Sequence, residues 1–74
     1  MSKLPIVSSK DLIKFLIEKK GFSYAHTRGS HHIYVSSNRR ISVPERQEMG
    51  RGLLLKILEE AGSGKEEFLK WWNG

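Results

Sequence analysis

One short segment of the chain carries side chains that could exchange a proton and bind a phosphate group. It covers residues 28–34 and reads Arg-Gly-Ser-His-His-Ile-Tyr. Histidine has an ordinary pKa closer to neutrality than other side chains, so an imidazole can take up or release a proton at working pH. RNA supplies its own nucleophile, the 2′-hydroxyl, and one imidazole acting as general base beside nearby cations would be enough to cleave it. Here Arg28 offers charge, and the Gly29-Ser30 turn offers backbone N–H groups.

The residue types alone do not decide which of the two histidines would act. Alternate side chains of a strand lie on opposite faces, which places His31 with Ile33 and Val35 but His32 with Tyr34. Ile33 and Val35 are typical core residues, so alternation favours His32 as the histidine open to RNA, unless the turn lifts His31 clear of the core. A pair of histidines that opens a strand is more often structural or simply exposed than catalytic.

Other catalytic and metal-binding patterns are missing from the sequence. It has no P-loop, no His-Glu-x-x-His motif, no cysteine nucleophile and no Gly-x-Ser-x-Gly elbow. The three histidines, His26, His31 and His32, have no carboxylate or cysteine near them in sequence and match no common zinc spacing. We therefore expect no metal and no other cofactor.

Positive charge is concentrated in the middle of the chain. From Lys19 to Arg46 there are six lysines and arginines but one acid, Glu45, so this segment holds all of the net charge of +5. Such a segment is expected of a protein that binds a phosphate backbone. On charge alone, a solvated basic surface without a partner is an equally good interpretation.

Length and composition predict one small domain. A chain of 74 residues without cysteine has a marginal core that disulfides do not supplement. No apolar run is long enough to span a bilayer, and the N-terminus has no hydrophobic signal-peptide segment. We expect a soluble, cytoplasmic protein with no membrane partner.

Periodicity and capping residues predict the elements that position the histidines. A helix begins at Ser8, where Asp11 would complete a capping box, and ends at Gly21. Strands over residues 22–27, 31–36 and 40–43 are separated by tight turns, and the last strand ends at a proline. Short connections imply an antiparallel meander, one face of which can stay open to solvent.

Two further helices are expected in the C-terminal part. Apolar residues at helical spacing follow Gly50 and Gly52, and Gly62 would end this second helix. Ser63 and Glu66 predict a capping box for a short third helix. Its Trp72 lies four residues after Phe68 and should pack on it, whereas Trp71 is expected to be the more exposed of the two.

The element order α-β-β-β-α-α predicts a two-layer α+β domain over residues 1–74. Its sheet would have three antiparallel strands, with helices covering one face and leaving the other available.

In combination, these segments resemble the HicA (YcfA-like) family of bacterial and archaeal toxins. The resemblance covers nearly the whole chain and is carried by Leu12–Ile17, Lys20-Gly21-Phe22, residues 28–34, Val43-Pro44, Met49–Leu58, Glu60-Ala61-Gly62 and Glu66–Leu69. It implies a fold similar to a double-stranded-RNA-binding domain. It also implies the toxin of a type II toxin–antitoxin system, an mRNA interferase that is a metal-independent endoribonuclease and is blocked by a HicB-type antitoxin.

The resemblance also assigns roles to residues. The histidine of the family's Gly-Ser-His turn falls on His31, which moves the preference for the catalytic residue from His32 to His31. Many family members carry a second histidine two residues after the Val-Pro that ends the third strand, but this chain has Arg46 there. Arginine can contact phosphate but cannot serve as a general base at neutral pH.

Three hypotheses follow. The first is a ribonuclease toxin with His31 as general acid/base, in which RNA is bound by Arg28, Gly29, Ser30, His32, Arg39, Arg40 and Arg46. The second is an RNA-binding domain of the same fold without catalysis, which the arginine at position 46 slightly favours. The third is a protein-interaction domain whose basic surface meets an acidic partner such as the antitoxin.

Overall fold

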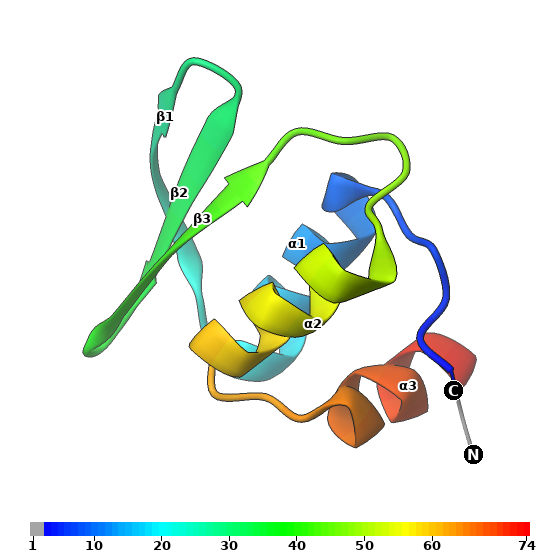
Figure 1. The fold of residues 1–74 in the computed structure, drawn as a ribbon. Coiled ribbons are helices and arrows are strands. Elements are labelled where there is room, and N and C mark those ends of the chain that lie inside the picture. Colours follow the sequence, from blue (N-terminus) through cyan, green and yellow to red (C-terminus); the bar gives the residue numbers. More distant parts are fainter. Residues whose placement is uncertain (1–2) are drawn as a thin grey trace.

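In the computed structural model, which describes residues 3–74, three helices lie on one side of a three-stranded antiparallel sheet (Figure 1). The elements are α1 (Ser9–Lys20), β1 (Ser23–Arg28), β2 (His31–Ser36), β3 (Arg39–Pro44), α2 (Arg51–Glu60) and α3 (Lys65–Asn73). This order confirms the predicted α+β class and the α-β-β-β-α-α succession. None of the helices in residues 3–74 has the length and apolar character needed to cross a membrane.

The predicted ends of α1 are confirmed. Ser8 Oγ accepts a hydrogen bond from the Asp11 N–H at 3.2 Å, and the Asp11 carboxylate accepts one from the Ser8 N–H at 3.1 Å. This capping box satisfies backbone donors that a helix start leaves unpaired. At the other end Gly21 adopts a left-handed conformation with φ of 70°, which glycine tolerates without strain.

The sheet is an antiparallel meander in the order β1-β2-β3. Only Gly29 and Ser30 separate β1 from β2, and Gly29 has φ of 59°. Strand β1 ends at Arg28, one residue beyond the predicted end at Thr27, and Arg28 pairs directly with His31. An irregularity between Tyr24 and His26 shifts the register within β1.

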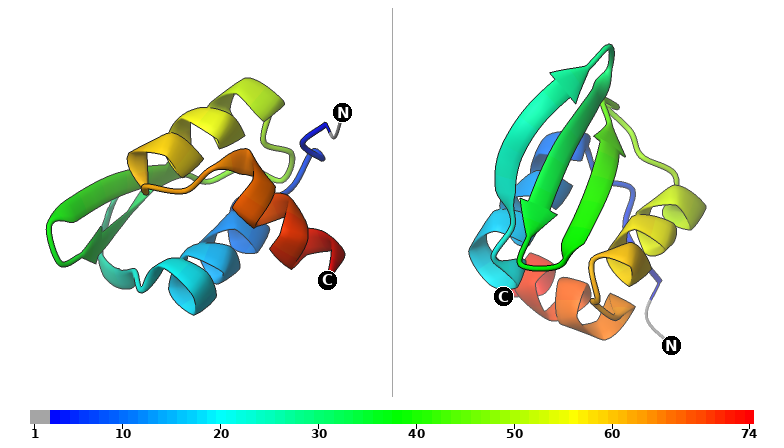
Figure 2. Two further views of the ribbon diagram at one scale, coloured as in Figure 1. Left: turned by 90° about the horizontal axis from the view of Figure 1, so that it is seen from below. Right: turned by 90° about the vertical axis from the view of Figure 1, so that its left-hand side faces the viewer.

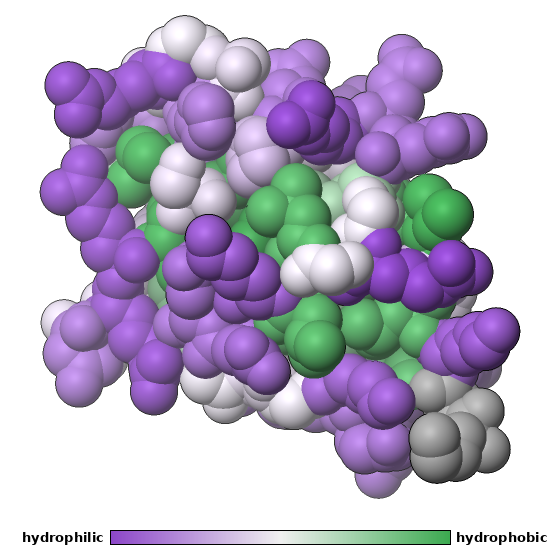
Figure 3. Space-filling model, in the orientation of Figure 1, coloured by the Kyte–Doolittle hydropathy of each residue, from purple (hydrophilic) through white to green (hydrophobic). Residues whose placement is uncertain are grey.

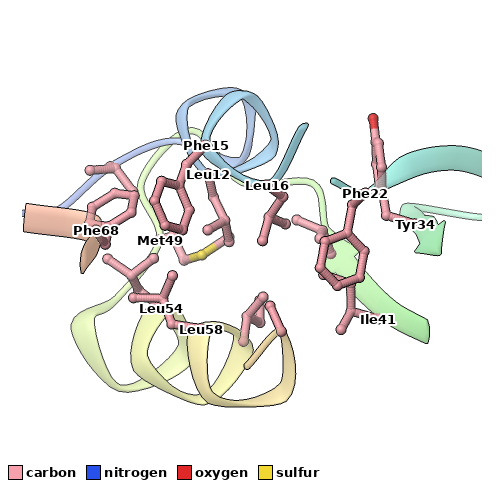
Figure 4. Packing of buried hydrophobic residues seen from close by; sticks show 14 of the residues in the cluster. Leu12, Phe15, Leu16, Phe22, Tyr34, Ile41, Met49, Leu54, Leu58 and Phe68 are labelled. Carbon is pink, nitrogen blue, oxygen red and sulfur yellow. The ribbon is translucent and has the colours of Figure 1, made fainter. Parts of the chain in front are cut away.

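The core lies between α1, α2 and the face of the sheet that the helices cover. Leu12, Phe15 and Leu16 of α1 meet Leu54 and Leu58 of α2, all of them buried (Figure 4). In Figure 2, right, the sheet is seen from its other side, with the helices behind it and α2 beside β3. One face of the sheet is therefore left open.

The start of α3 differs from the prediction. Its N-cap is Gly64, which makes no side-chain capping bond, so the capping box expected at Ser63 is wrong. The N–H of Ser63 donates to Leu58 O at 2.8 Å, which holds Ser63 in the turn that ends α2. Its hydroxyl instead donates to the Glu67 carboxylate at 3.0 Å.

The relative exposure of the two tryptophans is the reverse of the expectation. Trp72 stacks on Phe68 with ring centroids 6.0 Å apart, as predicted, but it is 40% exposed. Trp71 is the more buried ring. It lies 5.4 Å from Phe15, and its Nε1–H donates to the Glu18 carboxylate at 3.1 Å. The prediction for Trp71 is wrong because this residue, three positions after Phe68, faces α1.

Candidate active site

Cross-strand register divides the sheet into two faces. Tyr34 pairs with Ile41, and both belong to the buried core together with Val43, so their face is the covered one. Burial, and then the charge of the neighbouring Tyr24, raise the pKa of Tyr34. Side chains of the alternate positions lie on the opposite side. This open face consists of Ser23, His26, Arg28, His31, Ile33, Val35, Arg40, Ser42 and Pro44.

The face assignment predicted from β2 is therefore wrong. Tyr34, not Ile33, is the β2 residue that joins the main core, although Ile33 is itself only 6% exposed. The reason is that α1 packs on the face of Tyr34, where Ile13 and Ile17 line a hollow beside its ring. His31 consequently lies on the open face and His32 on the covered one.

His31 lies at the first position of β2, exposed, between Arg28 of β1 and Pro44 of β3. Directly opposite residues of neighbouring strands have Cβ atoms about 5 Å apart, so the Arg28 side chain starts beside the imidazole. Within the described part of the chain, no hydrogen bond involves the His31 ring. Both ring nitrogens are thus available to a ligand.

A groove of about 250 Å³ runs from His31 to helix α2. Ser42 and Pro44 line it from β3. The helix contributes residues spaced by three and four positions, which share one face of a helix: Leu53, Lys56, Ile57 and Glu60. An imidazole, a hydroxyl, an ammonium and a carboxylate therefore border one hollow that is also lined by apolar side chains.

The second histidine is held at both ring nitrogens. His32 Nδ1 lies 3.0 Å from Thr27 Oγ1, and Nε2 lies 3.1 Å from the Glu45 carboxylate. The Tyr24 hydroxyl adds a further bond to Thr27 Oγ1 at 2.7 Å. A neutral ring satisfies every partner when Nε2–H donates to Glu45 and Nδ1 accepts from Thr27, which in turn accepts from Tyr24. His32 thus fastens the β1–β2 hairpin to the segment after β3.

The segment after β3 is also fastened to α1. Ser9 is buried, and its hydroxyl donates to Pro44 O and accepts from the Arg46 N–H, both at 2.6 Å. The Ser9 N–H donates to Arg46 O at 2.9 Å. Glu45 N–H donates to Ser30 O at 2.8 Å, which ties the same segment to the hairpin turn. These bonds hold two segments next to His31 in place: the turn that precedes it in the chain, and the residues that follow β3 beside it.

The predicted RNA-contacting arginines occupy different places. Arg28 and Arg40 are exposed on the open face, and Arg46 is exposed just after β3. Arg39 lies elsewhere: its guanidinium donates to Glu60 O at 3.0 Å and lies close against Gly62, so it caps the C-terminus of α2.

Reasoning from the sequence did not include three polar residues that line the groove beside His31, namely Ser42, Lys56 and Glu60. The polar alternation of β3 indicates Ser42. No local pattern points to Lys56 or Glu60, because α2 approaches β3 only in the folded chain.

A family model described as the HicA toxin of bacterial toxin–antitoxin systems matches residues 9–63. The match runs from the first residue of α1 through the sheet and α2, and so contains the whole groove. The chain belongs to the HicA toxin family. It is thus the toxin component of a toxin–antitoxin pair, and its partner is an antitoxin. No curated protein and no solved structure matches the chain significantly.

Proposed function

We propose that this HicA toxin is an mRNA interferase, a metal-independent endoribonuclease in which His31 acts as general base. One observation carries the proposal: His31 is exposed, with no hydrogen-bond partner in residues 3–74, on a face that also carries Arg28 and Arg40. This is the arrangement that cleavage through the 2′-hydroxyl requires.

The reaction needs one proton acceptor and nearby positive charge. His31 takes the proton of the 2′-hydroxyl, and the 2′-oxygen attacks the adjacent phosphorus. The bond from phosphorus to the 5′-oxygen breaks, and that oxygen takes up a proton from solvent. The products are a 2′,3′-cyclic phosphate and a 5′-hydroxyl end. Arg28 stabilises the charge that develops on the phosphate oxygens, and general acid–base help of this kind contributes roughly 10²–10⁴-fold in rate.

RNA would lie across the open face. Arg28, opposite His31, and Arg40, opposite Val35, give this face positive charge near the two ends of β2, and Arg46 is a third exposed cation just after β3. The Gly29-Ser30 turn would approach the backbone closely, because Gly29 has no side chain to hold it away. The face then serves a phosphate backbone irrespective of base sequence.

The antitoxin is proposed to be a HicB-type protein with an acidic surface. The toxin carries a net charge of +5, so an acidic partner would bind by charge complementarity and would compete with RNA for the same face.

A modified substrate tests the proposed chemistry. We expect the purified toxin to cleave an oligoribonucleotide without added metal, and to leave intact the same oligonucleotide with a 2′-deoxyribose at the cleaved position. Cleavage of the deoxy-substituted bond would show that another nucleophile acts. Binding of both oligonucleotides without cleavage of either would favour the non-catalytic RNA-binding domain, for which Arg46 in place of a histidine is the supporting observation.

A further inference from the structure

The groove beside His31 has two chemically different parts. One part is apolar and is formed by Pro44 and Ile57, which are buried, and by the half-buried Leu53. Lys56 and Glu60 are exposed at its edge. A hollow made for phosphate alone would have no use for the apolar lining or for a carboxylate, because the carboxylate repels the phosphate anion.

We propose that this groove binds one unpaired RNA base, next to the bond at which His31 acts, and that it prefers a base with an exocyclic amino group. The inference rests on the proposed function and names the substrate feature that the same site reads. A base has apolar faces and a polar edge, which match the lining and the rim. The volume of about 250 Å³ lies just below the roughly 300–1,000 Å³ of sites for drug-sized ligands, as expected for a single ring system.

A base can enter the groove only when it is unpaired. The edge that would reach Glu60 is the edge used in base pairing, so a base within a duplex cannot present it. Proteins that read RNA sequence generally contact single-stranded or looped regions, where bases are splayed out. Although the open face is suited to a backbone of any form, the groove thus restricts cleavage to unpaired RNA.

Glu60 supplies the preference among bases. An ionised carboxylate only accepts hydrogen bonds. Cytosine offers its N4 amino group at the position where uracil has the O4 carbonyl, and a glutamate is a known acceptor for that amino group. Glu60 makes no ion pair with any residue from 3 to 74, and Arg39 bonds only its main-chain oxygen. Its carboxylate is therefore available to the base.

Lys56 completes the subsite. It lies four residues before Glu60, one turn nearer the N-terminus of the same helix, and lines the same groove. With the base held by Glu60 and the apolar lining, the Lys56 ammonium can reach the phosphate attached to that nucleotide. This places the phosphate between Lys56 and His31.

Nucleotides that cannot be cleaved test the proposal. Isotope-labelled toxin is titrated with cytidine 3′-monophosphate, uridine 3′-monophosphate and inorganic phosphate, and amide chemical shifts are followed by NMR. We expect the cytidine nucleotide to shift the amides of Ser42, Leu53 and Lys56 and to bind about tenfold more tightly than the uridine nucleotide, as one hydrogen bond to a charged group would give.

Two variants make the test specific. Glu60→Gln should remove the difference between the nucleotides, because an amide both donates and accepts. Glu59→Gln, an exposed neighbour on the same helix that does not line the groove, should keep it. Equal affinities for the two nucleotides in the wild type, or the same shifts with inorganic phosphate, would overturn the proposal. No cleavage occurs in this assay, so a toxin without nuclease activity would fail the proposed function and still give a clear result here.

Discussion

His31 and His32 are neighbours in the chain, but their side chains lie on opposite faces of the sheet. The ring of His31 is on the open face beside Arg28, without a hydrogen-bond partner in the described residues. The ring of His32 is bonded to both Thr27 and Glu45. One imidazole is therefore available for proton transfer, whereas the other holds the hairpin in place.

Replacing His32 should alter stability more than chemistry. We expect His32→Ala to lower the free energy of unfolding by about 1 kcal/mol, because the bonds to Thr27 and Glu45 are lost. RNA cleavage by the folded fraction should stay within roughly tenfold of the wild type, since the proposed general base is His31. Chemical denaturation and a cleavage assay at a temperature where both proteins are folded give the two values. A loss of cleavage as large as that of a His31 variant would contradict this assignment.

Arg39 and Arg40 are adjacent arginines with different expected roles. Arg40→Ala should weaken RNA binding and reduce the slope of log affinity against log salt by about one, as expected when one phosphate contact is lost. Arg39→Ala should leave that slope unchanged and reduce stability by about 0.5–1 kcal/mol, because Arg39 caps the negative end of the α2 dipole. Fluorescence anisotropy with a labelled oligonucleotide at several salt concentrations separates the two. Equal slopes for both variants would show that Arg39 also contacts the backbone.

The buried hydroxyl of Ser9 should be needed for stability. Ser9→Ala removes the donor to Pro44 O and the acceptor of the Arg46 N–H, leaving two backbone groups without this partner. We expect a loss of about 1–3 kcal/mol in the free energy of unfolding, measured by urea denaturation. The matched control is Ser23→Ala at an exposed strand position, which should change stability by less than about 0.5 kcal/mol. Similar effects of both substitutions would mean that Ser9 does not hold the segment after β3.

Acid should weaken the link between α1 and α3. Hydrogen bonds from Lys20 and Ser63 lower the pKa of Glu67 below its usual value. A lowered folded-state pKa gives stability that is present above the unfolded-state value, near 4.3, and is lost as the pH falls through the folded-state pKa. Glu67→Gln should therefore destabilise the protein at pH 7, by less than about 1 kcal/mol because the pair is partly exposed, and make little difference at pH 2.

The control for this pH dependence is Glu66→Gln. Glu66 shares the first turn of α3 with Glu67, but no hydrogen bond or ion pair links it to Lys20. Its replacement should remove only a favourable helix-dipole interaction. Unfolding curves that depend on pH in the same way for both variants would show that the Lys20 contact does not lower the pKa of Glu67.

Local signals in the sequence were sufficient to predict the elements. Ser8 with Asp11, and Gly21, specify both ends of α1 through bonds that form within a few residues. The Gly29-Ser30 pair specifies the hairpin turn. At Ser63 the same reasoning failed, because its N–H bonds back to Leu58 and the residue belongs to the end of α2. A capping pattern does not show which of two adjoining helices will use it.

The face of β2 could not be predicted from β2 alone. Ile33 and Tyr34 are adjacent and both buried, so the strand has no clear alternation between polar and apolar residues. The next strand has one: Ile41 is buried, whereas Arg40 and Ser42 are exposed. Because Tyr34 pairs with Ile41, the pattern of β3 identifies the covered face of both strands. The groove could not be predicted from any strand or helix alone, because Lys56 and Glu60 come close to His31 only when α2 packs beside β3.

The central claim is that His31 carries the chemistry, and expression in bacteria tests it most directly. Wild type, His31→Ala and His26→Ala are induced in parallel, with growth and the integrity of bulk mRNA as readouts and circular dichroism of the purified proteins as the check on folding. His26 is the matched control, because it is an exposed histidine of the same open face that does not line the groove.

We predict growth arrest and degraded mRNA for the wild type and for His26→Ala, and normal growth with intact mRNA for His31→Ala, because losing the general base slows cleavage roughly 10²–10⁴-fold. Arrest with degraded mRNA in the folded His31→Ala variant would contradict the claim and assign the chemistry to another residue.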